Sequence, residues 1–457
     1  MVVRPWSPFF SASVGISIPF AVLLSMAGHL GNYGAHRVVA AEGWTRFRGP
    51  TGQGIATDHQ APVHFSLHQG IVWKTPIEGT GWSSPVSDGR RIWLTTAIAS
   101  PASEEEKQAR LAGNQAGGPK ELAGEVTFKA VCVDFQSGQI VHSITLGAET
   151  DPDPINPLNS YASPTPVVDE DRVYCDFGNY GTWCLDAETG EQVWHRQYDV
   201  DYSVGPGSSP VVVEDTLILV CDGIDQQFVV GLDKQTGQER WRTPRPPKRA
   251  SNVEFRKAYS TPLVLRWQGE YQVVIPTAQW LCGYDPSTGQ ELWRFDHGDG
   301  FSVSPMAIQA GDLLVFSTGF MRPELVAVRW GDDGVVSEHE EVWRQSRGAP
   351  TKPSPLPIGP WIYVVSDRGI LSQLDAQTGE IRWQQRLGGN YSASPVLVGN
   401  HLYLCSHEGE VIVVGVGPEY VEVARNELEP RLMASPAIVD ENLIIRSEKH
   451  LFRIGEK

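Results

Sequence analysis

One ten-residue pattern recurs along this chain and constrains its fold more than any other feature. Each copy has an aspartate at its second position, Thr-Gly in its middle and a tryptophan at its end. The four clearest copies are LDAETGEQVW from Leu185, LDKQTGQERW from Leu232, YDPSTGQELW from Tyr284 and LDAQTGEIRW from Leu374. Repetition of this kind is typical of proteins in which one small supersecondary unit is copied many times.

A second marker gives the number of copies and their period. Ser-Pro or Thr-Pro followed by apolar residues recurs at a spacing of mostly about 40 to 50 residues, which is the range of propeller blades. The eight copies begin at Ser84, Ser163, Ser209, Thr261, Ser304, Ser354, Ser394 and Ser435.

The second repeat shows the unit most clearly. Four short apolar stretches, at 165–168, 172–176, 182–186 and 192–197, are separated by residues that favour tight turns. Four strands joined in this way form an antiparallel meander. The sequence therefore predicts an all-β fold, an eight-bladed β-propeller of four-stranded antiparallel blades.

The repeated aspartates and tryptophans have structural explanations. A carboxylate next to Thr-Gly can accept hydrogen bonds from the backbone amides of the turn, so we expect turn residues rather than catalytic ones. A tryptophan at one position per blade is expected to wedge between adjacent sheets. His142 in blade one and Val423 in blade seven replace it. The aspartates are Asp186, Asp233, Asp285 and Asp375, and the tryptophans are Trp194, Trp241, Trp293, Trp343 and Trp383.

The last blade lacks a strand within its own stretch of sequence. After Ser435-Pro436 only three strands fit before Lys457, whereas residues 71–77 carry Trp73 in register with the other tryptophans. We therefore expect this N-terminal strand to complete blade eight and to close the ring. The propeller then spans residues 71–457, and residues 42–70 form a lead-in segment.

Residues 1–41 do not fit the repeat. Arg4 precedes an apolar stretch, and Ala40-Ala41 offers small residues for cleavage, as in a secretory signal peptide. An uncleaved membrane anchor is the alternative, because the stretch is nearly long enough to span a bilayer. With the signal removed, the protein would be exported to the periplasm or the exterior and would have no membrane span.

The charge and the cysteines exclude some classes of function and leave others open. A formal net charge of −17 argues against nucleic acid as a partner. The six cysteines fall within expected strands, so buried thiols are the default interpretation. Cys175 and Cys184 flank a turn symmetrically, and a cross-strand disulfide between them is the alternative.

The blade signature, with Asp and Thr-Gly followed by Trp, resembles the repeat of the pyrroloquinoline quinone (PQQ)-like propeller superfamily. That superfamily includes quinoprotein alcohol dehydrogenases and BamB-type outer-membrane assembly factors. The resemblance implies that the enzymes carry adjacent cysteines near the quinone, carboxylate and amide ligands for calcium, and a catalytic aspartate. This chain has no adjacent cysteines and no Cys-x-x-Cys-His haem site. We therefore expect neither PQQ nor calcium as a cofactor and no catalytic residue. The alternative is a quinone- or small-ligand-dependent oxidoreductase, or a carbohydrate-binding propeller, that uses the central channel.

Three further motifs favour structural explanations. GPTGQG from Gly49 lacks the lysine of a phosphate-binding loop, so a flexible lead-in is expected there. His339 and His407 lack metal-site spacing, and we expect no metal site. DPDPINPLN from Asp151 could supply oxygen ligands to calcium, but its prolines favour a stiff connecting loop.

The long insertions fall on one face of the predicted ring. Turns between second and third strands and links between blades share this face, and they include 97–125, 147–160 and 242–257. Rigid scaffolds carry recognition on their loops, so this face is the expected binding surface for a protein or peptide partner. Side chains that enter the innermost strands from it could form a ligand pocket or plug the channel. They are Trp82, Tyr161, Tyr259, Phe301, Lys352, Tyr391 and Met433.

One loop runs against the acidic character of the chain. The segment between Trp241 and Tyr259 contains several basic residues and a single acidic residue, Glu254, and its three prolines are expected to stiffen it. This loop is predicted to be either a solvated linker or a basic arm that attracts an acidic partner. The candidate partner-binding residues are Arg245, Lys248, Arg249, Arg256 and Lys257.

Overall fold

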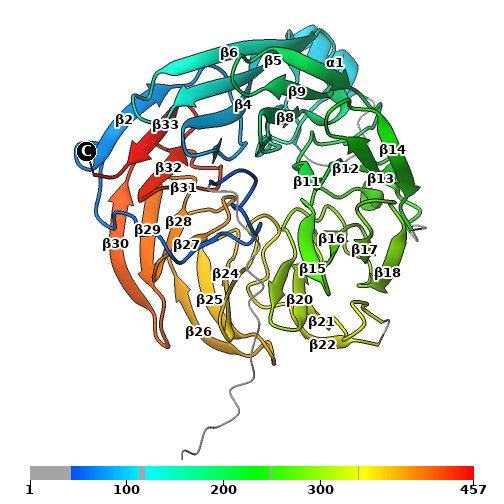
Figure 1. Cartoon of the computed structure of the whole chain (residues 1–457), viewed down its shortest axis with the longest axis vertical. Coiled ribbons are helices and arrows are strands. Elements are labelled where there is room, and N and C mark those ends of the chain that lie inside the picture. The colour runs from blue at the N-terminus through cyan, green and yellow to red at the C-terminus, as the bar shows by residue number, and fades with distance from the viewer. Residues whose placement is uncertain (1–42, 113–118, 247–249, 338, 457) are drawn as a thin grey trace, which may run out of the picture. The chain divides into compact units, whose positions relative to one another are not determined.

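The computed structural model describes residues 43–112, 119–246, 250–337 and 339–456. The predicted signal peptide, residues 1–41, lies outside them. Eight sheets, each with four antiparallel strands of the meander, are arranged in a ring, which confirms the predicted eight-bladed propeller (Figure 1). Within the described residues, no helix is long and apolar enough to cross a membrane.

The first four blades follow the chain in order. Blade one is β3 (Val86–Ser87), β4 (Arg91–Pro101), β5 (Ala123–Asp134) and β6 (Ile140–Glu149); blade two is β7 (Val167–Asp169), β8 (Arg172–Asp176), β9 (Thr182–Asp186) and β10 (Gln192–Arg196); blade three is β11 (Val211–Val213), β12 (Thr216–Asp222), β13 (Gln227–Asp233) and β14 (Glu239–Pro244); blade four is β15 (Leu263–Trp267), β16 (Glu270–Pro276), β17 (Trp280–Tyr284) and β18 (Glu291–Asp296).

The remaining blades continue the order, and two of them gain a strand from the N-terminal region. Blade five is β19 (Ile308–Ala310), β20 (Leu313–Ser317), β21 (Leu325–Arg329) and β22 (Glu341–Gln345); blade six is β23 (Leu356–Ile358), β24 (Trp361–Val365), β25 (Ile370–Asp375) and β26 (Ile381–Arg386); blade seven is β27 (Val396–Val398), β28 (His401–Cys405), β29 (Glu410–Gly415) and β30 (Val421–Glu427), with β1 (Ile55–Ala56) added; blade eight is β31 (Ala437–Val439), β32 (Asn442–Arg446), β33 (His450–Ile454) and β2 (Ile71–Pro76).

Among the described residues, three short helical segments lie in the connections. They are α1 (Glu104–Leu111), η1 (Gly178–Tyr180) and η2 (Val253–Arg256). The helix α1 sits at the tip of the long β4–β5 hairpin and begins with a capping box, in which Ser103 and Glu106 bond reciprocally.

The ring closes through the N-terminal strand, as predicted. β2 pairs antiparallel with β33, and the register places Trp73 opposite Arg453. The indole of Trp73 donates to the carbonyl of Phe135 in blade one at 2.9 Å. The two ends of the propeller are therefore joined inside one sheet, and no open strand edge remains at the seam.

In several blades the repeated tryptophan docks on the Thr-Gly turn of the next blade. Trp194 of blade two lies against Gly237 in the Thr-Gly turn of blade three, where a Cβ atom would come within 2.6 Å of the indole. Its Nε1 donates to the carbonyl of Lys234 in the same turn at 3.0 Å. The contact requires glycine for two reasons: a Cβ atom would collide with the indole, and the φ of +67° at Gly237 is unfavourable for other residues. Trp241 and Trp343 make the same contact with Gly289 and Gly379.

Blades that lack one half of this motif use substitutes. His142 takes the tryptophan position in blade one, and its Nε2 lies 3.0 Å from the carbonyl of Glu188 in the turn of blade two. Blade five has no Thr-Gly turn, so Trp293 bonds Gln272, whose amide reaches the carbonyl of Gly334. The wedge interpretation therefore holds in outline, but the partner of the tryptophan is a turn rather than a sheet face.

The aspartates before Thr-Gly are turn residues, as predicted. Asp186 accepts hydrogen bonds from the backbone amides of Glu188 and Thr189 at 3.0 and 2.8 Å. The amide of Thr189 makes the largest contribution in lowering the pKa of Asp186. Asp233, Asp285 and Asp375 accept equivalent bonds.

A ring of hydroxyl groups surrounds the channel at the start of the innermost strands. Each hydroxyl accepts a hydrogen bond from a backbone amide of the preceding blade at 2.9–3.1 Å; six of the seven donors are themselves ring members, and the seventh is Met306 in blade five. The seven members of this hydroxyl ring are Ser84, Thr165, Ser209, Thr261, Ser354, Ser394 and Ser435. The strand register therefore corrects two of the eight sequence markers, because Thr165 and Met306 occupy the positions expected for Ser163 and Ser304.

The lead-in segment is not a flexible tether, contrary to expectation. The amides of Ser87 in blade one and Leu397 in blade seven donate to the carbonyls of Trp44 and Gly54, and β1 runs parallel to β27. Arg48 is fully buried and donates to the carbonyl of Pro355 at 2.6 Å. The segment therefore crosses the middle of the ring, where Figure 1 draws it in dark blue, on the face that carries the short turns.

The cysteines are free thiols, which settles the alternative of a disulfide. All six are buried and unpaired. In the β8–β9 hairpin Tyr174 lies opposite Cys184, and Cys175 lies opposite Trp183. The two cysteines are therefore offset by one residue and point to opposite faces of the sheet.

The docking of Trp194 gives a testable estimate of what one blade junction contributes. We expect Trp194→Ala to lower the free energy of unfolding by about 3 to 5 kcal/mol, because a buried indole and its hydrogen bond are lost. Val193→Ala is the matched control, since Val193 is 42% exposed in the same strand, and it should cost about 0.5 kcal/mol or less. Equal denaturant midpoints for the two variants would show that the junction does not depend on the indole.

Candidate functional site

The central channel forms a cavity of about 670 Å³ that opens between the links from blade to blade. We call it the central cavity, and we call the face onto which it opens the loop-rich face. All seven members of the hydroxyl ring line its wall, and Phe47 of the lead-in segment lines it as well. Because the lead-in segment crosses the opposite face, the central cavity is a cup rather than a through-channel.

The structure places five of the seven predicted channel-mouth residues in the lining of this cavity. They are Trp82, Tyr259, Phe301, Lys352 and Met433. Tyr161 and Tyr391 do not line it. Tyr161 is 5% exposed and donates to the carbonyl of Asp153 at 2.8 Å, and Tyr391 is fully buried against the core between blades six and seven. Both tyrosines therefore pack inside the protein instead of facing a ligand.

The cations at the cavity mouth are already engaged within the protein. Lys352 forms an ion pair with Asp367 at 2.9 Å. Arg431 stands over the ring of Trp82, with its guanidinium carbon 5.0 Å from the ring centroid. The wall of the central cavity is therefore mostly hydroxyl and aromatic in character, with little unpaired charge.

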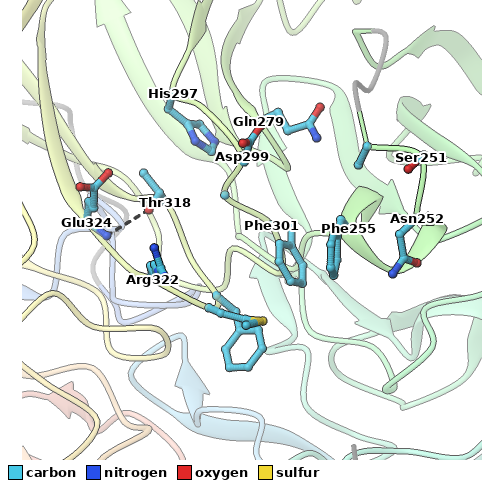
Figure 2. A pocket seen from close by; sticks show the side chains of 14 residues that line it. Ser251, Asn252, Phe255, Gln279, His297, Asp299, Phe301, Thr318, Arg322 and Glu324 are labelled. Carbon is cyan, nitrogen blue, oxygen red and sulfur yellow. Dashed lines mark hydrogen bonds between the residues drawn. The ribbon is translucent and has the colours of Figure 1, made fainter. Parts of the chain in front are cut away.

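A second cavity of about 700 Å³, which we call the side cavity, lies next to the first and is shown in Figure 2. Phe255, Phe301, Phe320 and Met321 line both cavities. The rings of Phe255 and Phe301 lie 4.3 Å apart, and Phe320 meets Phe301 edge-on at 5.9 Å. These side chains form an apolar partition between the two cavities.

The partition is exposed to solvent where it reaches the surface. Met321 is 64% exposed, Phe320 51% and Phe255 38%. None of these three residues was among the binding residues predicted from the sequence. One sequence feature could have indicated them. The apolar pair Phe320-Met321 lies between Gly319 and Pro323, in a loop segment without the alternation of apolar and polar residues that marks a strand.

The far wall of the side cavity is polar. His297 is 3% exposed, its Nε2 lies 2.9 Å from the carbonyl of Thr277, and its Nδ1 has no partner among the described residues. Burial lowers the pKa of His297 to about 4, so its imidazole stays neutral at physiological pH. Figure 2 shows it on the same side of the cavity as Thr318, which accepts from the amide of Glu324 at 3.0 Å.

In the described part of the basic loop, the candidate cations are engaged within the protein. Arg245 has no exposed side-chain surface and is paired with Asp222. Lys257 is 5% exposed and is paired with Glu254. Arg256 is half-buried and donates to the carbonyl of Ala250 inside its own loop. Two of the five candidates are thus structural, and Lys248 and Arg249 lie outside the described residues.

Arg245 and Asp222 form the centre of a buried polar network between blades three and four. The guanidinium donates to both carboxylate oxygens at 2.8 and 2.9 Å, and it also donates to the hydroxyl of Tyr284 at 3.1 Å. Thr277 adds a bond to the same carboxylate at 2.8 Å. Although burial opposes it, the charge of Asp222 raises the pKa of Arg245 well above its ordinary value.

Asp176 ends the second strand of blade two, as Asp222 does in blade three, but it has no arginine. It receives bonds from Thr182 Oγ1 at 2.6 Å and from the amide of Gly178 at 3.2 Å. Burial outweighs these bonds and raises the pKa of Asp176 to about 7.

The residues proposed as alternative metal ligands serve local bonds. Asn159 Oδ1 accepts from Ser160 and Ser163, and Asp153 accepts from Asn179. Across the described residues, no three His, Cys, Asp or Glu side chains are placed to hold a metal ion. His407 instead lies 2.8 Å from the hydroxyl of Ser392.

Comparison with known proteins links the chain to one family by sequence and to a wider group by fold. The family model described as outer membrane protein assembly factor BamB matches residues 86–282 and 277–416. The outer membrane protein assembly factor BamB of Escherichia coli is 25% identical over 136 residues, which cover 26% of this chain and 34% of that protein. The match thus spans about a third of that relative.

Two solved structures share the fold at low sequence identity. A europium-containing methanol dehydrogenase superposes with a TM-score of 0.59 at 11% identity, covering 89% of each chain. A quinohemoprotein alcohol dehydrogenase from Pseudomonas putida gives a TM-score of 0.59 at 11% identity, covering 92% of this chain and 81% of that one. These similarities are evidence for the eight-bladed architecture alone.

The buried network predicts a large difference between two neighbouring arginines. We expect Arg245→Ala to lower the free energy of unfolding by about 3 to 5 kcal/mol, because the carboxylate of Asp222 would remain buried without its partner. Arg240→Ala, which removes a partly exposed pair with Asp233, should cost about 0 to 1 kcal/mol. Chemical denaturation of both variants measures the difference. Equal costs would mean that Arg245 is solvated and available to a partner after all.

The raised pKa of Asp176 predicts that the free energy of unfolding decreases as pH rises. Its pKa is raised from 3.8 to about 7 in the folded protein, so the unfolded chain gives up the proton first as pH rises. The free energy of unfolding should therefore fall between pH 4 and pH 7, by up to about 4 kcal/mol at about 1.4 kcal/mol for each pKa unit.

Asp176→Asn isolates this contribution from that of the other carboxylates. The variant should become more stable relative to the parent as pH rises from 4 to 7, in denaturation curves measured at each pH. A constant difference between variant and parent across this range would refute the raised pKa.

Proposed function

Because the chain belongs to the family of the outer membrane protein assembly factor BamB, we propose that it is an exported scaffold that binds a protein or peptide partner in the cell envelope. The binding surface is the loop-rich face. The name of its relatives describes a role in the assembly of outer membrane proteins, and the predicted signal peptide would export this chain to the periplasm or the exterior.

The observation that carries this proposal is the exposed apolar partition. Phe320 and Met321 stand more than half exposed on a rigid ring, at the rim of two cavities. Aromatic and methionine side chains are enriched at protein interfaces, because each buries a large apolar area when a partner covers it. The polar surroundings of the two cavities supply hydrogen bonds at the edge of such a contact.

The rival function is a quinone-dependent oxidoreductase that uses the central cavity. The residues present do not fit that chemistry. In the described part of the chain, the lining of the central cavity includes a single carboxylate, Glu254, and no cysteine. Glu254 is already bound to Lys257 and Ser203, so it offers no free ligand set for calcium. We therefore propose a binding protein without PQQ.

Site-specific photocrosslinking in the native host tests the proposed surface. With a photoreactive amino acid at Met321, we expect one discrete adduct with a protein partner. The same amino acid at Gln235, an exposed residue in a short turn on the opposite face, serves as the control and should give none. Adding Phe320→Ser to the protein that carries the photoreactive amino acid at position 321 should reduce the yield of the adduct. Identical adduct patterns from both positions, or none from either, would refute the assignment of the loop-rich face.

Incubation of the purified protein with PQQ and calcium tests the rival function. We expect no reduction of an artificial electron acceptor above background with primary alcohols or sugars, because the cavity lacks the groups that would hold the cofactor. Activity above background would make the chain an enzyme.

A further inference from the structure

The hydroxyl ring has a property that the proposed protein contact does not use. Each hydroxyl accepts one hydrogen bond from the backbone of the preceding blade, and among the described residues none of the seven has an acceptor for its own O–H. All seven side chains belong to residues that are at most 4% exposed. Each oxygen thus keeps one donor and one lone pair that no described residue uses, on side chains that line the central cavity.

The arrangement of these groups restricts the ligand. The hydroxyls follow one another from blade to blade around the wall, so they surround the cavity and do not converge on one point. A single oxyanion cannot contact groups on opposite sides of such a ring. A cyclic molecule with hydroxyls around its edge can, and those hydroxyls would both donate to and accept from the wall.

The charge of the site also argues against an anion. Lys257 and Lys352, the two lysines in the lining, are each paired with a carboxylate of the protein. No positive charge among the described lining residues is therefore free to neutralise an anionic ligand, and the chain as a whole is acidic.

Aromatic rings stand above the hydroxyls. Trp82, Tyr259 and Phe301 line the same cavity, and the hydroxyl of Tyr259 is committed to the carbonyl of Tyr202 at 2.7 Å. Arg431 covers one face of Trp82, and Phe301 is packed against Phe255, so only the remaining aromatic surface meets the cavity. That surface is suited to the apolar C–H groups of a pyranose ring, whereas the hydroxyl ring is suited to its edge. A volume of about 670 Å³ lies within the range of small-molecule sites.

We propose that the central cavity binds a neutral saccharide, with its hydroxyls on the hydroxyl ring and its ring face on the aromatic side chains. This site shares Phe301 with the apolar partition, whereas its seven hydroxyls are distinct from the exposed Phe320 and Met321 to which the protein partner is assigned.

Ligand-observed NMR on the purified protein tests the proposal with a panel of neutral mono- and disaccharides, including glucose, N-acetylglucosamine, maltose and cellobiose, and with sulfate and phosphate. We expect saturable binding of at least one neutral saccharide and none of the two anions. Binding of the anions alone, or of nothing in the panel, would overturn the proposal.

Two double variants locate the site. Thr165→Val with Thr261→Val keeps the side-chain shape but removes two O–H groups, so saccharide binding should weaken about tenfold or more. Thr165→Ser with Thr261→Ser keeps both O–H groups and should bind within about twofold of the parent.

The valine pair also removes two acceptors within the ring, so a third variant guards against loss of folding. Ser304→Phe places a bulky ring in the cavity lining outside the hydroxyl ring. It should abolish saccharide binding and leave the Met321 crosslink intact. Unchanged saccharide binding in the valine pair or in Ser304→Phe would place the saccharide elsewhere and contradict the proposal.

Discussion

The contact between a tryptophan of one blade and a glycine of the next is the interaction on which this structure depends. An indole can lie flat on the Thr-Gly turn only where no Cβ intervenes, and the aspartate before the turn holds the backbone so that a carbonyl faces the indole nitrogen. At the four junctions that have this contact, one blade fixes the orientation of the next. The rigid ring that results is what allows irregular loops to hold a defined surface.

Closure of the ring has a second consequence, for the channel. The N-terminal region supplies both the last strand of blade eight and the segment that crosses the short-turn face, with Arg48 buried and the pKa of its guanidinium lowered to about 9 by that burial. One end of the channel is thereby covered. The other end opens among the loops, so that the cavities, the exposed apolar partition and the hydroxyl ring all face the same side.

The periodic features of this fold could be predicted from sequence, and the local ones could not. Trp73, in register with the later tryptophans, was enough to predict closure, because one position in the repeat has one structural role. Arg245 pairs with Asp222, but no repeated sequence pattern links the two residues. Arg245 was therefore predicted to lie in an exposed basic loop, whereas it forms a buried ion pair. Likewise, the register of the β8–β9 hairpin differs by one residue from the symmetric pairing considered for Cys175 and Cys184, so the two cysteines do not lie opposite each other. Neither the ion pair nor the strand register can be deduced from the sequence alone.

Hydrogen–deuterium exchange resolved to single amides tests the central claim, that the seam between blades eight and one is as firmly joined as any other junction. The amide of Ser435 donates across this seam to Ser84, as that of Ser354 donates to Ser394 within the continuous chain. The account predicts that the Ser435 amide exchanges as slowly as the Ser354 amide. Markedly faster exchange at Ser435 would show that the ring opens at its seam and would contradict the account.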